Sequence, residues 1–394
     1  MAVLGDYISI KHGYAFKGDF ISTANSGIVL VTPGNFAIGG GFKENKCKYF
    51  TGDYSEEYVL KPNDLIVTMT DLSKNGDTLG YSALVPDTSR IYLHNQRIGL
   101  IQIESDEISK DYLYWFMRTR KYQKKIVATA SGSTVKHTSP SRICEIEIEL
   151  PSLEEQNKIA SVLNNIENKI YENSAINKNL EQQAQAIFAN EFLSLETLPE
   201  GWKQASLIDI ADYLNGLAMQ KYRPTADESG IPVLKIKELR QGCYDNNSEL
   251  CSPSIKSDYI IHDGDVIFSW SGSLLVDLWC GGICGLNQHL FKVTSNKYDK
   301  WFYYAWTKHH LDRFVAVAAD KATTMGHIKR DELAKAEVLI PNEADYNRIG
   351  ALLQPIYEMI ISNRIENKRL AATRDILLPK LMNGEIDMSE VDYE

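Results

Sequence analysis

Cysteine and long apolar runs are scarce in this chain, and each shortage excludes a class of protein. Six cysteines in 394 residues are too few for a framework of disulfides, and the start Met-Ala-Val-Leu-Gly-Asp lacks the basic and apolar regions of an export signal. No stretch approaches the ~18 uncharged apolar residues of a membrane span. We therefore expect a cytoplasmic protein with free thiols and no association with membranes.

The sequence also lacks the loops that two classes of enzyme require. Its 12 prolines include no Pro-Pro pair, which the Asn/Asp-Pro-Pro-aromatic loop of amino-methyltransferases contains, and no Gly-x-x-x-x-Gly-Lys-Ser/Thr phosphate loop occurs. Residues 167–169 and 366–368 each read Glu-Asn-Lys, residue types that nucleases cluster, but both triplets lie in segments expected to be helical, without a partner strand. We expect no catalytic residue and no bound cofactor in this chain.

One cysteine segment invites a zinc interpretation. Cys280 and Cys284 frame a Cys-Gly-Gly-Ile-Cys run, with His289 downstream and Cys243 or Cys251 upstream. Structural zinc sites commonly pair their cysteines at Cys-x-x-Cys spacing, whereas three residues separate this pair and the first half of the chain has no equivalent. We therefore interpret the segment as a glycine turn with two buried thiols, and we expect no metal site.

The formal net charge of −10 is concentrated in two segments. Residues 152–200 carry −5 and residues 341–394 carry −4, whereas residues 1–151 and 201–340 are near neutral at 0 and −1. The two neutral segments can therefore form local basic faces. Tight binding of a nucleic acid would nevertheless need positive charge from a partner as well.

What the chain does contain is two copies of one unit. The offset between matching segments falls from 203 residues at the start to 190 at the end, and nine residues are lost between the landmarks Asp64 and Asn95. A constant framework whose loops change length is expected of two related binding domains with different targets, although drift after duplication is an alternative. The matching segments are 4–6 with 207–209, 27–30 with 230–233, 64–66 with 265–267, 95–96 with 287–288, and His137 with His327.

Each copy ends in a long predicted helix whose inward positions recur in steps of four and three. Two such seams can pack together as in a coiled coil, and the pseudo-twofold symmetry of a duplicated chain runs the helices antiparallel, with the preceding domains at opposite ends of a rod. The first seam is Ile159, Leu163, Ile166, Ile170, Asn173, Asn177, Leu180, Ala184 and Ile187. The second seam, 190 residues later, is Ile349, Leu353, Ile356, Ile360, Asn363, Asn367, Leu370, Arg374 and Leu377.

Sequence signals place the ends of both helices. Ser152 with Glu155 forms a capping box, and Asn342 with Asp345 is its analogue. The first helix should extend to about residue 194, and Asn383-Gly384 is a suitable stop for the second.

Asparagines occupy the middle of each seam. A polar residue there costs stability but penalises misregistered pairings that would leave it without a partner, so we expect the four side chains to meet near the midpoint. Four asparagines on an exposed outer face are the alternative. The residues are Asn173, Asn177, Asn363 and Asn367.

The segment before each helix is predicted to be a mixed domain of strands and helices. Strand-like runs at 29–31, 65–68, 98–101 and 146–150 accompany one clear helix from Tyr112 to Ile126, whose counterpart runs from Trp301 to Val315. The densest positive cluster of the chain is Arg118, Arg120, Lys121, Lys124 and Lys125.

The predicted fold is therefore α/β (α+β), with two pseudo-twofold-related mixed domains separated by two long helices that pack as an antiparallel coiled coil. The predicted divisions are a first domain at 1–151, a central spacer helix at 152–197, a second domain at 198–341, a C-terminal spacer helix at 342–384 and an acidic tail at 385–394.

Three segments of this sequence resemble those of a known family. Residues 151–160 (Pro-Ser-Leu-Glu-Glu-Gln-Asn-Lys-Ile-Ala), 180–188 (Leu-Glu-Gln-Gln-Ala-Gln-Ala-Ile-Phe) and 198–202 (Leu-Pro-Glu-Gly-Trp) resemble the DNA-specificity subunits of type I restriction-modification systems. The resemblance covers essentially the whole chain. Two features depart from it, because residues 341–346 lack the Glu-Gln of the first copy and Arg374 replaces an apolar seam residue.

The resemblance implies two target recognition domains, each reading one half of a split double-stranded DNA sequence, with the paired helices setting the gap. It implies a non-catalytic subunit whose partners are modification subunits, which bind S-adenosylmethionine and methylate adenine, and restriction subunits, which use ATP and Mg to translocate and cut. Two alternatives remain open: a recognition subunit for a methyltransferase of another restriction type, and a tandem-domain structural adaptor that binds protein.

The candidate DNA-contacting residues are polar and basic side chains in loops. Paired donors and acceptors at 94–97 and 287–289 suit base edges, although strand-end framework is an alternative, and the segments 131–137 and 321–327 suit phosphates, with ordinary polar turns as the alternative. Less regular loops, which differ between the copies, are expected to carry specificity. The candidates are Lys11, Lys17, Thr70, Ser73, Lys74, Asn95, Gln96, Arg97, Ser131, Ser133, Lys136, His137, Lys221, Arg223, Ser271, Ser273, Asn287, Gln288, His289, Lys321, Thr323, Thr324 and His327.

Overall fold

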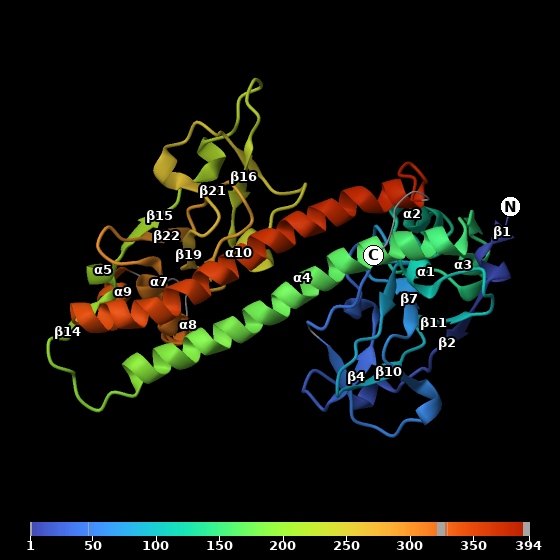
Figure 1. Cartoon of the computed structure of the whole chain (residues 1–394), viewed down its shortest axis with the longest axis horizontal. Helices are drawn as coiled ribbons and strands as arrows, with labels where there is room; N and C mark the ends of the chain where they lie inside the picture. The colour runs from blue at the N-terminus through green and yellow to red at the C-terminus, as the bar shows by residue number, and fades with distance from the viewer. Residues whose placement is uncertain (1, 46, 321–327, 329, 389–394) are drawn as a thin grey trace. The chain divides into compact units, whose positions relative to one another are not determined.

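The computed structural model describes residues 2–45, 47–320, 328 and 330–388. The chain divides into two compact units, one made of Met1–Glu167 with Ala372–Glu394 and the other of Asn168–Ala371. Two long helices, α4 (Leu153–Phe188) and α10 (Glu343–Met382), each contribute residues to both units (Figure 1). Among the described residues, no helix combines the length and apolar character needed to cross a bilayer.

The first unit holds a domain with two larger sheets, one of order β3-β5-β4-β10-β6 and one of order β2-β11-β7-β9. Strands β4 and β10 are parallel, whereas the second sheet is antiparallel. The strands are β1 (Ala2–Val3), β2 (Ile8–His12), β3 (Ile21–Ser22), β4 (Ile28–Val31), β5 (Lys48–Phe50), β6 (Val59–Leu60), β7 (Leu65–Thr68), β8 (Thr70–Asp71), β9 (Ser82–Leu84), β10 (Ile91–His94), β11 (Ile98–Ile103), β12 (Lys136–His137) and β13 (Glu147–Ile148). The helices of this domain are α1 (Lys110–Phe116), α2 (Arg120–Ala128) and α3 (Pro140–Cys144).

The second unit repeats this plan. Its antiparallel sheet has the order β15-β22-β19-β20, and β16 pairs with β21 in parallel, as β4 pairs with β10 in the first unit. The strands are β14 (Lys203–Ser206), β15 (Asp212–Asn215), β16 (Ile231–Leu234), β17 (Leu250–Cys251), β18 (Ile260–Ile261), β19 (Val266–Ser269), β20 (Leu275–Leu278), β21 (Cys284–Leu286), β22 (Leu290–Thr294) and β23 (Glu337–Ile340). The helices are α5 (Leu207–Ile210), α6 (Ile236–Gln241), α7 (Lys300–His309), α8 (Leu311–Asp320) and α9 (Arg330–Ala334).

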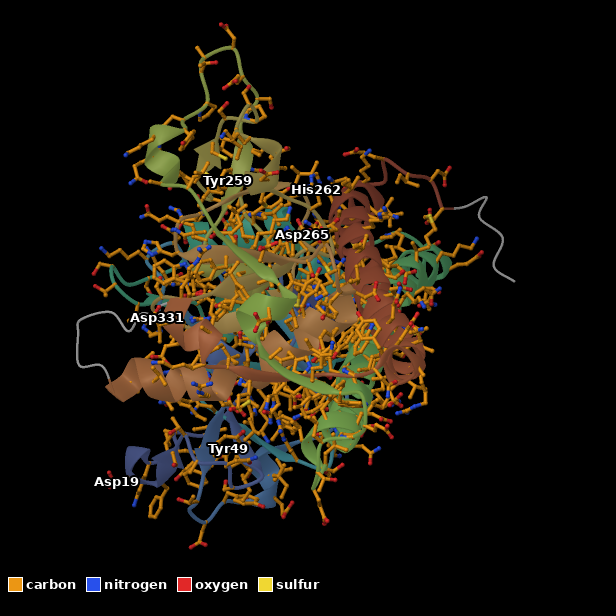
Figure 2. The ribbon with its side chains drawn as sticks, turned by 90° about the vertical axis from the view of Figure 1, so that its left-hand side faces the viewer. Asp19, Tyr49, Tyr259, His262, Asp265 and Asp331 are labelled. Atoms are coloured by element: carbon orange, nitrogen blue, oxygen red, sulfur yellow. The ribbon has the colours of Figure 1, made fainter. Side chains whose placement is uncertain are left out.

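Capped turns explain the landmarks of the repeat. The carboxylate of Asp64 accepts a hydrogen bond from the backbone N–H of Lys61 (2.8 Å), and Asp265 accepts the matching bond from His262 (2.9 Å; both are labelled in Figure 2). A short side chain that fixes a turn in this way is constrained by local geometry in both copies. The same bond recurs at the start of each copy, from Val3 to Asp6 (2.9 Å) and from Ser206 to Asp209 (2.8 Å).

The single helix predicted from Tyr112 to Ile126 is wrong, because the chain forms two helices there. Helix α1 ends at Phe116, and α2 starts after Thr119, whose hydroxyl accepts the N–H of Tyr122 (3.2 Å) and donates to the carbonyl of Phe116 (2.8 Å). A threonine that caps a new helix competes with continuation of the old one. The counterpart in the second copy is divided in the same place, between α7 and α8.

The break also separates Arg118 from the other residues of the basic cluster predicted at 118–125. Arg118 lies in the break and turns inward, with its side chain only 4% exposed. Its guanidinium stacks over the ring of Trp115 (4.2 Å) and donates to the carboxylate of Glu167 (3.2 Å). Lys121 donates to the side chain of Asn383 (3.3 Å) and Lys125 lies 3.9 Å from the carboxylate of Glu147, whereas Arg120 and Lys124 are exposed on α2.

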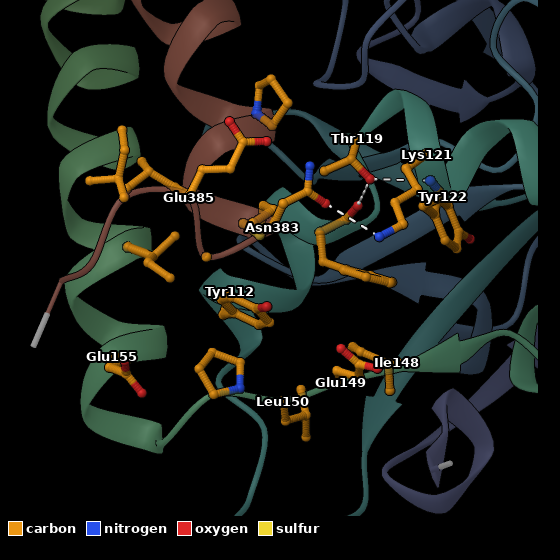
Figure 3. A pocket seen from close by; sticks show the side chains of 18 of the residues that line it. Tyr112, Thr119, Lys121, Tyr122, Ile148, Glu149, Leu150, Glu155, Asn383 and Glu385 are labelled. Carbon is orange, nitrogen blue, oxygen red and sulfur yellow. Dashed lines mark hydrogen bonds between the residues drawn. The ribbon is translucent and has the colours of Figure 1, made fainter.

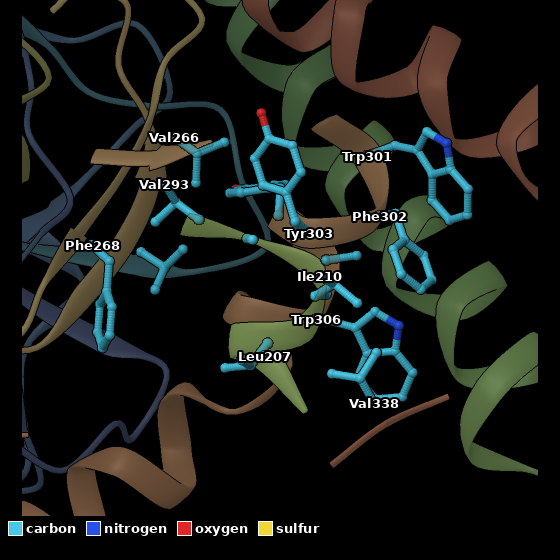
Figure 4. Close-up of a cluster of buried hydrophobic side chains, with 14 of the residues drawn as sticks. Leu207, Ile210, Val266, Phe268, Val293, Trp301, Phe302, Tyr303, Trp306 and Val338 are labelled. Carbon is cyan, nitrogen blue, oxygen red and sulfur yellow. The ribbon is translucent and has the colours of Figure 1, made fainter. Parts of the chain in front are cut away.

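Each domain shares its core with both long helices. In the second unit, the buried cluster drawn in Figure 4 joins aromatic residues of α7 to β19, and it includes Phe188 of α4 and Leu353 of α10. The rings of Phe188 and Trp306 meet edge to face at 5.0 Å. In the first unit, the corresponding cluster includes Leu163 of α4 and Leu381 of α10. Burial of apolar surface therefore fixes each domain to a helix pair rather than to one helix.

The mid-seam asparagines meet as predicted. Asn173 donates its amide to the side-chain oxygen of Asn367 (2.9 Å), and Asn363 donates to that of Asn177 (2.9 Å). Both bonds lie within the second unit, and their order along the two helices makes the pair antiparallel there. The alternative of four outward-facing asparagines is therefore wrong, because Asn173 and Asn177 are buried at 1% and 7% exposure.

The caps predicted for the two long helices are present in the structure. The hydroxyl of Ser152 accepts the N–H of Glu155 (3.3 Å), and the side chain of Asn342 accepts that of Asp345 (2.9 Å). Helix α4 ends at Phe188, and a single π-helical turn, Ala189–Leu193, continues it to the predicted limit. All eighteen seam residues are buried or partly buried. The predicted fold class, two mixed sheet domains with two long helices packed together, is confirmed.

Arg374, the charged residue at an otherwise apolar position of the second seam, forms an ion pair in the first unit. The guanidinium of Arg374 pairs with Glu167 (2.7 Å), which also receives Arg118 (3.2 Å). We call Arg118, Glu167 and Arg374 the ionic clasp. It joins one domain to both helices, and Arg374 therefore makes an ion pair where an apolar seam residue would only pack.

Candidate nucleic-acid interface

Four loops of the first domain are joined edge to edge by backbone hydrogen bonds. We call them the first loop row: residues 13–17, 94–97, 69–77 and 131–138. Because the row follows the ends of several strands, its side chains are held by the sheets beneath. The joining bonds run from Tyr14 N to His94 O (2.8 Å), Gln96 N to Tyr14 O (2.9 Å), Met69 N to Arg97 O (2.9 Å) and Thr138 N to Met69 O (3.0 Å).

The second domain has a corresponding second loop row: residues 216–223, 286–289, 270–273 and, at its edge, Ile328. Three of the joining bonds recur at matched positions. They run from Leu217 N to Leu286 O (2.9 Å), Gln288 N to Leu217 O (2.9 Å) and Ile328 N to Trp270 O (3.0 Å). The candidates Lys321, Thr323, Thr324 and His327 lie outside the described residues.

A glycine makes the close approach of two loops possible in each row. A Cβ atom on Gly13 would lie 2.3 Å from the carbonyl oxygen of His94, and one on Gly216 would lie 2.2 Å from that of Asn287. Real Cβ atoms essentially never come within 3.0 Å of backbone atoms. The matched glycines are therefore required by packing of the rows, not by an unusual backbone angle.

The asparagines shared by both copies support their own turns. Asn95 is 9% exposed, and its side-chain oxygen accepts the N–H of Arg97 (3.1 Å). Asn287 is 7% exposed and accepts the N–H of His289 (3.2 Å). A side chain that holds its own turn in both copies is expected of the common framework, which was the alternative to base contact for these segments. The neighbouring side chains of Gln96 and Arg97 are exposed, and those of Gln288 and His289 are partly exposed.

Two loops that were predicted as separate candidates, the one around Thr70 and the one at 131–137, are paired in the structure. Strand β8 pairs with β12, which sets Thr70 opposite His137 and Asp71 opposite Lys136. The hydroxyl of Thr70 lies 3.1 Å from Nδ1 of His137. Ser271 makes the analogous contact with Nδ1 of His289 (3.0 Å) in the second row.

Asp71 organises the tip of the first row and was missed by the sequence reasoning. Its buried carboxylate accepts hydrogen bonds from the N–H of Ser73 (2.6 Å) and from both the N–H and hydroxyl of Thr78. Burial alone would raise the pKa of Asp71, but the bonds from Thr78 and Ser73 outweigh it and leave this pKa below its ordinary value. The carboxylate therefore stays charged while turned inward. An Asp-x-Ser turn motif was the available signal.

The remaining candidate DNA-contacting side chains fall into two groups: some already bond within the protein, and others are exposed to solvent. Lys11 pairs with Glu57 (3.1 Å), Arg223 pairs with Glu249 (2.5 Å), and the Ser73 hydroxyl accepts the N–H of Asp77 (2.8 Å). Lys136 is partly exposed, whereas the others project into solvent. The exposed set is Lys17, Lys74, Ser131, Ser133, Lys221 and Ser273, with His137 at the edge of the first row.

The two rows differ in their aromatic content. Trp270 stacks on Phe291 (5.5 Å between ring centroids) and donates its indole N–H to Asn215 (3.0 Å), whereas its matched position in the first row is Met69. The first row instead exposes Tyr14, which is 48% exposed and packs on Tyr58 at 5.0 Å. Similar frameworks therefore present different side chains.

A separate cavity of about 1070 Å³ lies in the first unit (Figure 3). Its walls come from the start of α4, the end of α10 and α2, and Lys121 donates to Asn383 within it (3.3 Å). Glu149, Glu155 and Glu385 also line it. This mixture of charges does not suit a phosphate backbone, and the cavity lies apart from the loop row.

Both cysteines of the segment Cys280–Cys284 are buried, whereas Ile283 between them is exposed. Burial raises the pKa of Cys280 to about 11 and that of Cys284 to about 12. A zinc ligand must be a thiolate, which these surroundings disfavour. Within residues 2–45, 47–320, 328 and 330–388, no three His, Cys, Asp or Glu side chains come together as a metal site.

The family model described as the type I restriction modification DNA specificity domain matches residues 3–182 and 199–371, once in each copy. The specificity subunit of the type I restriction enzyme MjaIX from Methanocaldococcus jannaschii is 27% identical over 73% of this chain and 72% of its own length. The EcoKI specificity subunit from Escherichia coli is 25% identical over 84% of this chain and 76% of its own.

The fold comparison agrees with these matches. The crystal structure of a type I restriction-modification S subunit from M. genitalium superposes with a TM-score of 0.60, at 14% identity, over 96% of this chain and 94% of that one. At this identity the likeness concerns the fold.

Proposed function

Because the chain belongs to the type I restriction-modification DNA specificity family, as a specificity subunit with two target recognition domains, we propose that each domain reads one half of a bipartite DNA target. The first domain, 1–151, reads through the first loop row, and the second, 198–341, through the second. The observation that carries this proposal is the recurrence of the row, with matched backbone bonds and different exposed side chains.

The helix pair acts as the spacer between the two readings. Helices α4 and α10 run through both units, and the asparagine pairs fix their register. A stiff spacer makes the second binding event intramolecular, at a high effective concentration, only when the half-sites have the correct separation. Gap length is therefore selected together with base sequence.

The catalytic work belongs to other subunits of the type I complex. Modification subunits bind S-adenosylmethionine and methylate adenine within each half-site, and restriction subunits use ATP and Mg to translocate and cleave. The specificity subunit binds none of these cofactors. It works in the cytoplasm on double-stranded DNA, and the complex supplies positive charge that an acidic chain of net charge −10 lacks.

Mapping of methylated adenines tests this function directly. Genomes of a strain with the gene and of a strain without it would be compared by sequencing that detects the modified base. A single bipartite motif with a fixed gap should disappear with the gene. An unchanged pattern, or loss of a continuous motif, would contradict the proposal.

Arg97→Ala should relax recognition of one half-site only. Arg97 is exposed in the turn of the first row, and a bidentate arginine contact to a base is worth about 1–3 kcal/mol. Binding of the assembled complex would be measured on duplexes altered in either half-site. Arg90→Ala is the matched control, because Arg90 pairs with Glu44 outside the row (3.3 Å). Equal loss on both half-sites would refute the assignment of one domain to one half.

Lys136→Ala should weaken binding to all sequences alike. A lysine on a phosphate adds affinity without reading bases, and its loss should reduce the slope of log affinity against log salt by about one. The measurement is a salt titration of the assembled complex on specific and unrelated duplexes. Lys61→Ala is the control, since Lys61 lies in the turn before β7, whereas the row segment 69–77 follows the other end of this strand. A changed base preference with an unchanged slope would argue against phosphate contact.

A further inference from the structure

The tip of the first loop row exposes an apolar side chain. Leu72 directly follows β8 and is 69% exposed, in a loop whose next residues are Ser73, Lys74 and Asn75. The matched position in the second row is Ser273, so the leucine is not part of the common framework. An exposed leucine gains nothing from folding, and here polar residues that suit nucleic acid surround it.

The loop that carries Leu72 is fixed on both sides. On one side Asp71 accepts the N–H of Ser73 (2.6 Å) and the hydroxyl of Thr78 (2.6 Å). On the other, the carbonyl of Gly76 accepts the side-chain amide of Gln123 (2.8 Å) from α2. Leu72 is therefore held outward by a network that its own side chain does not help to build. Such a preorganised group loses little conformational entropy when it meets a ligand.

The shape of the segment around Leu72 suits the major groove of DNA better than the minor groove. Strands β8 and β12 form a two-stranded ribbon, and Leu72 leaves the ribbon at the end of β8. The major groove of B-DNA, about 12 Å wide, admits a two-stranded ribbon, whereas the minor groove is about 6 Å wide. If this ribbon enters the major groove, a leucine at its end would face the base edges. The one apolar group on those edges is the C5 methyl of thymine.

We propose that Leu72 determines specificity by packing against a thymine C5 methyl in the half-site read by the first domain. The proposal rests on the proposed function, because it assigns the first loop row to one half-site. Lys74 and Asn75 beside it then approach neighbouring base edges or phosphates. At the matched place Ser273 offers a hydroxyl instead, which accounts for different targets on one framework.

The test removes the methyl group from the DNA and the leucine from the protein in combination. Each thymine of the first half-site, on either strand, is replaced in turn by uracil, and binding of the assembled complex is measured with the native chain and with Leu72→Ala. One uracil should weaken binding of the native complex about fourfold, the effect expected for one buried methyl. That same uracil should have no effect on the Leu72→Ala complex, whose binding to the thymine duplex should already be several-fold weaker.

Two controls separate this contact from folding and from general binding. Ile38→Ala removes an equally exposed side chain (70%) of the same domain outside the loop row, and it should behave as the native chain does. Uracil in the second half-site should give equal ratios for the native chain and Leu72→Ala. Both variants should match the native melting temperature, because neither residue is buried.

The outcomes discriminate between the two proposals. If the native complex shows no bipartite preference at all, the proposed function fails. If it binds a bipartite site but every uracil affects the native and Leu72→Ala complexes equally, Leu72 reads no methyl group and this inference is overturned.

Discussion

Replacing Glu167 by alanine is expected to destabilise the first unit by about 3 kcal/mol, because it leaves a buried guanidinium without its carboxylate. The Arg118 side chain is 4% exposed and that of Arg374 is 19% exposed, and both pair with Glu167. Arg118 keeps two other acceptors, the hydroxyl of Tyr114 (2.6 Å) and the carbonyl of Gly39 (3.0 Å). The expected loss therefore lies at the low end of the range for broken buried pairs.

The ionic clasp also predicts a pH dependence. Burial alone would raise the pKa of Glu167, but the charges of Arg118 and Arg374 outweigh it and lower this pKa below its ordinary value near 4.5. A depressed pKa means that the stabilisation is fully present above the unfolded-state pKa and is lost as the pH falls through the folded-state value. Glu167→Gln should remove that part of the acid dependence.

Hydrogen exchange measured peptide by peptide is the suitable readout, since a chain of two units need not unfold in one step. Peptides covering 110–128 and 160–170 should exchange faster in Glu167→Ala, whereas peptides from 260–310 should not. Glu172→Ala is the matched control, because Glu172 is an exposed acid on the same helix. Equal protection in the Glu167 and Glu172 variants would show that the clasp contributes no stability.

Replacing Gly13 by alanine is expected to abolish recognition of one half-site, with a loss of at least about 100-fold in binding of the assembled complex. The added Cβ would lie 2.3 Å from the carbonyl oxygen of His94 and 2.4 Å from that of Asn95, so two backbone segments must separate. Overpacking of this kind costs about 1–3 kcal/mol or more, and here the displaced segments carry Gln96 and Arg97. Residual binding should no longer respond to base changes in the first half-site.

The duplicated chain supplies its own comparison for this result. Gly216→Ala should produce the mirror outcome, with the second half-site unread and the first still discriminated, because its Cβ would lie 2.2 Å from the carbonyl oxygen of Asn287. Gly18→Ala is the neutral control, since nothing lies within 4 Å of the added atom. If Gly13→Ala binds as tightly and as selectively as Gly18→Ala, the first loop row is not the reading surface.

Features that depend on local geometry could be predicted from the sequence. The seam steps, the capping pairs at Ser152 and Asn342, and the meeting of Asn173 with Asn367 all follow from helical periodicity and from the cost of an unpaired buried amide. The repeat landmarks Asp64 and Asp265 were visible because each caps its own turn. Short-range hydrogen bonds of this kind can be predicted because donor and acceptor lie only a few residues apart in the sequence.

Distant contacts outside the helical seam could not be predicted from the sequence. Arg118 looked like part of a basic face, but its inward position depends on an ion pair with Glu167, which is distant in the sequence, in addition to stacking on Trp115. The pairing of β8 with β12 joins residues separated by more than sixty positions, so nothing near Leu72 indicates that it is held outward. The capping role of Thr119 was visible in principle, yet continuous helical spacing around it concealed the break.

Each domain shares its core with two helices, and this limits how a target specificity can be transferred from one such protein to another. A segment cut at residue 151 leaves behind Leu163, which is 0% exposed, and Leu381, which is 3% exposed, and both belong to the core beneath the first loop row. A graft made at that junction would join foreign strands to mismatched helix surfaces. The portable module is discontinuous, made of Met1–Glu167 together with Ala372–Glu394, so both ends of the gene must be transferred together.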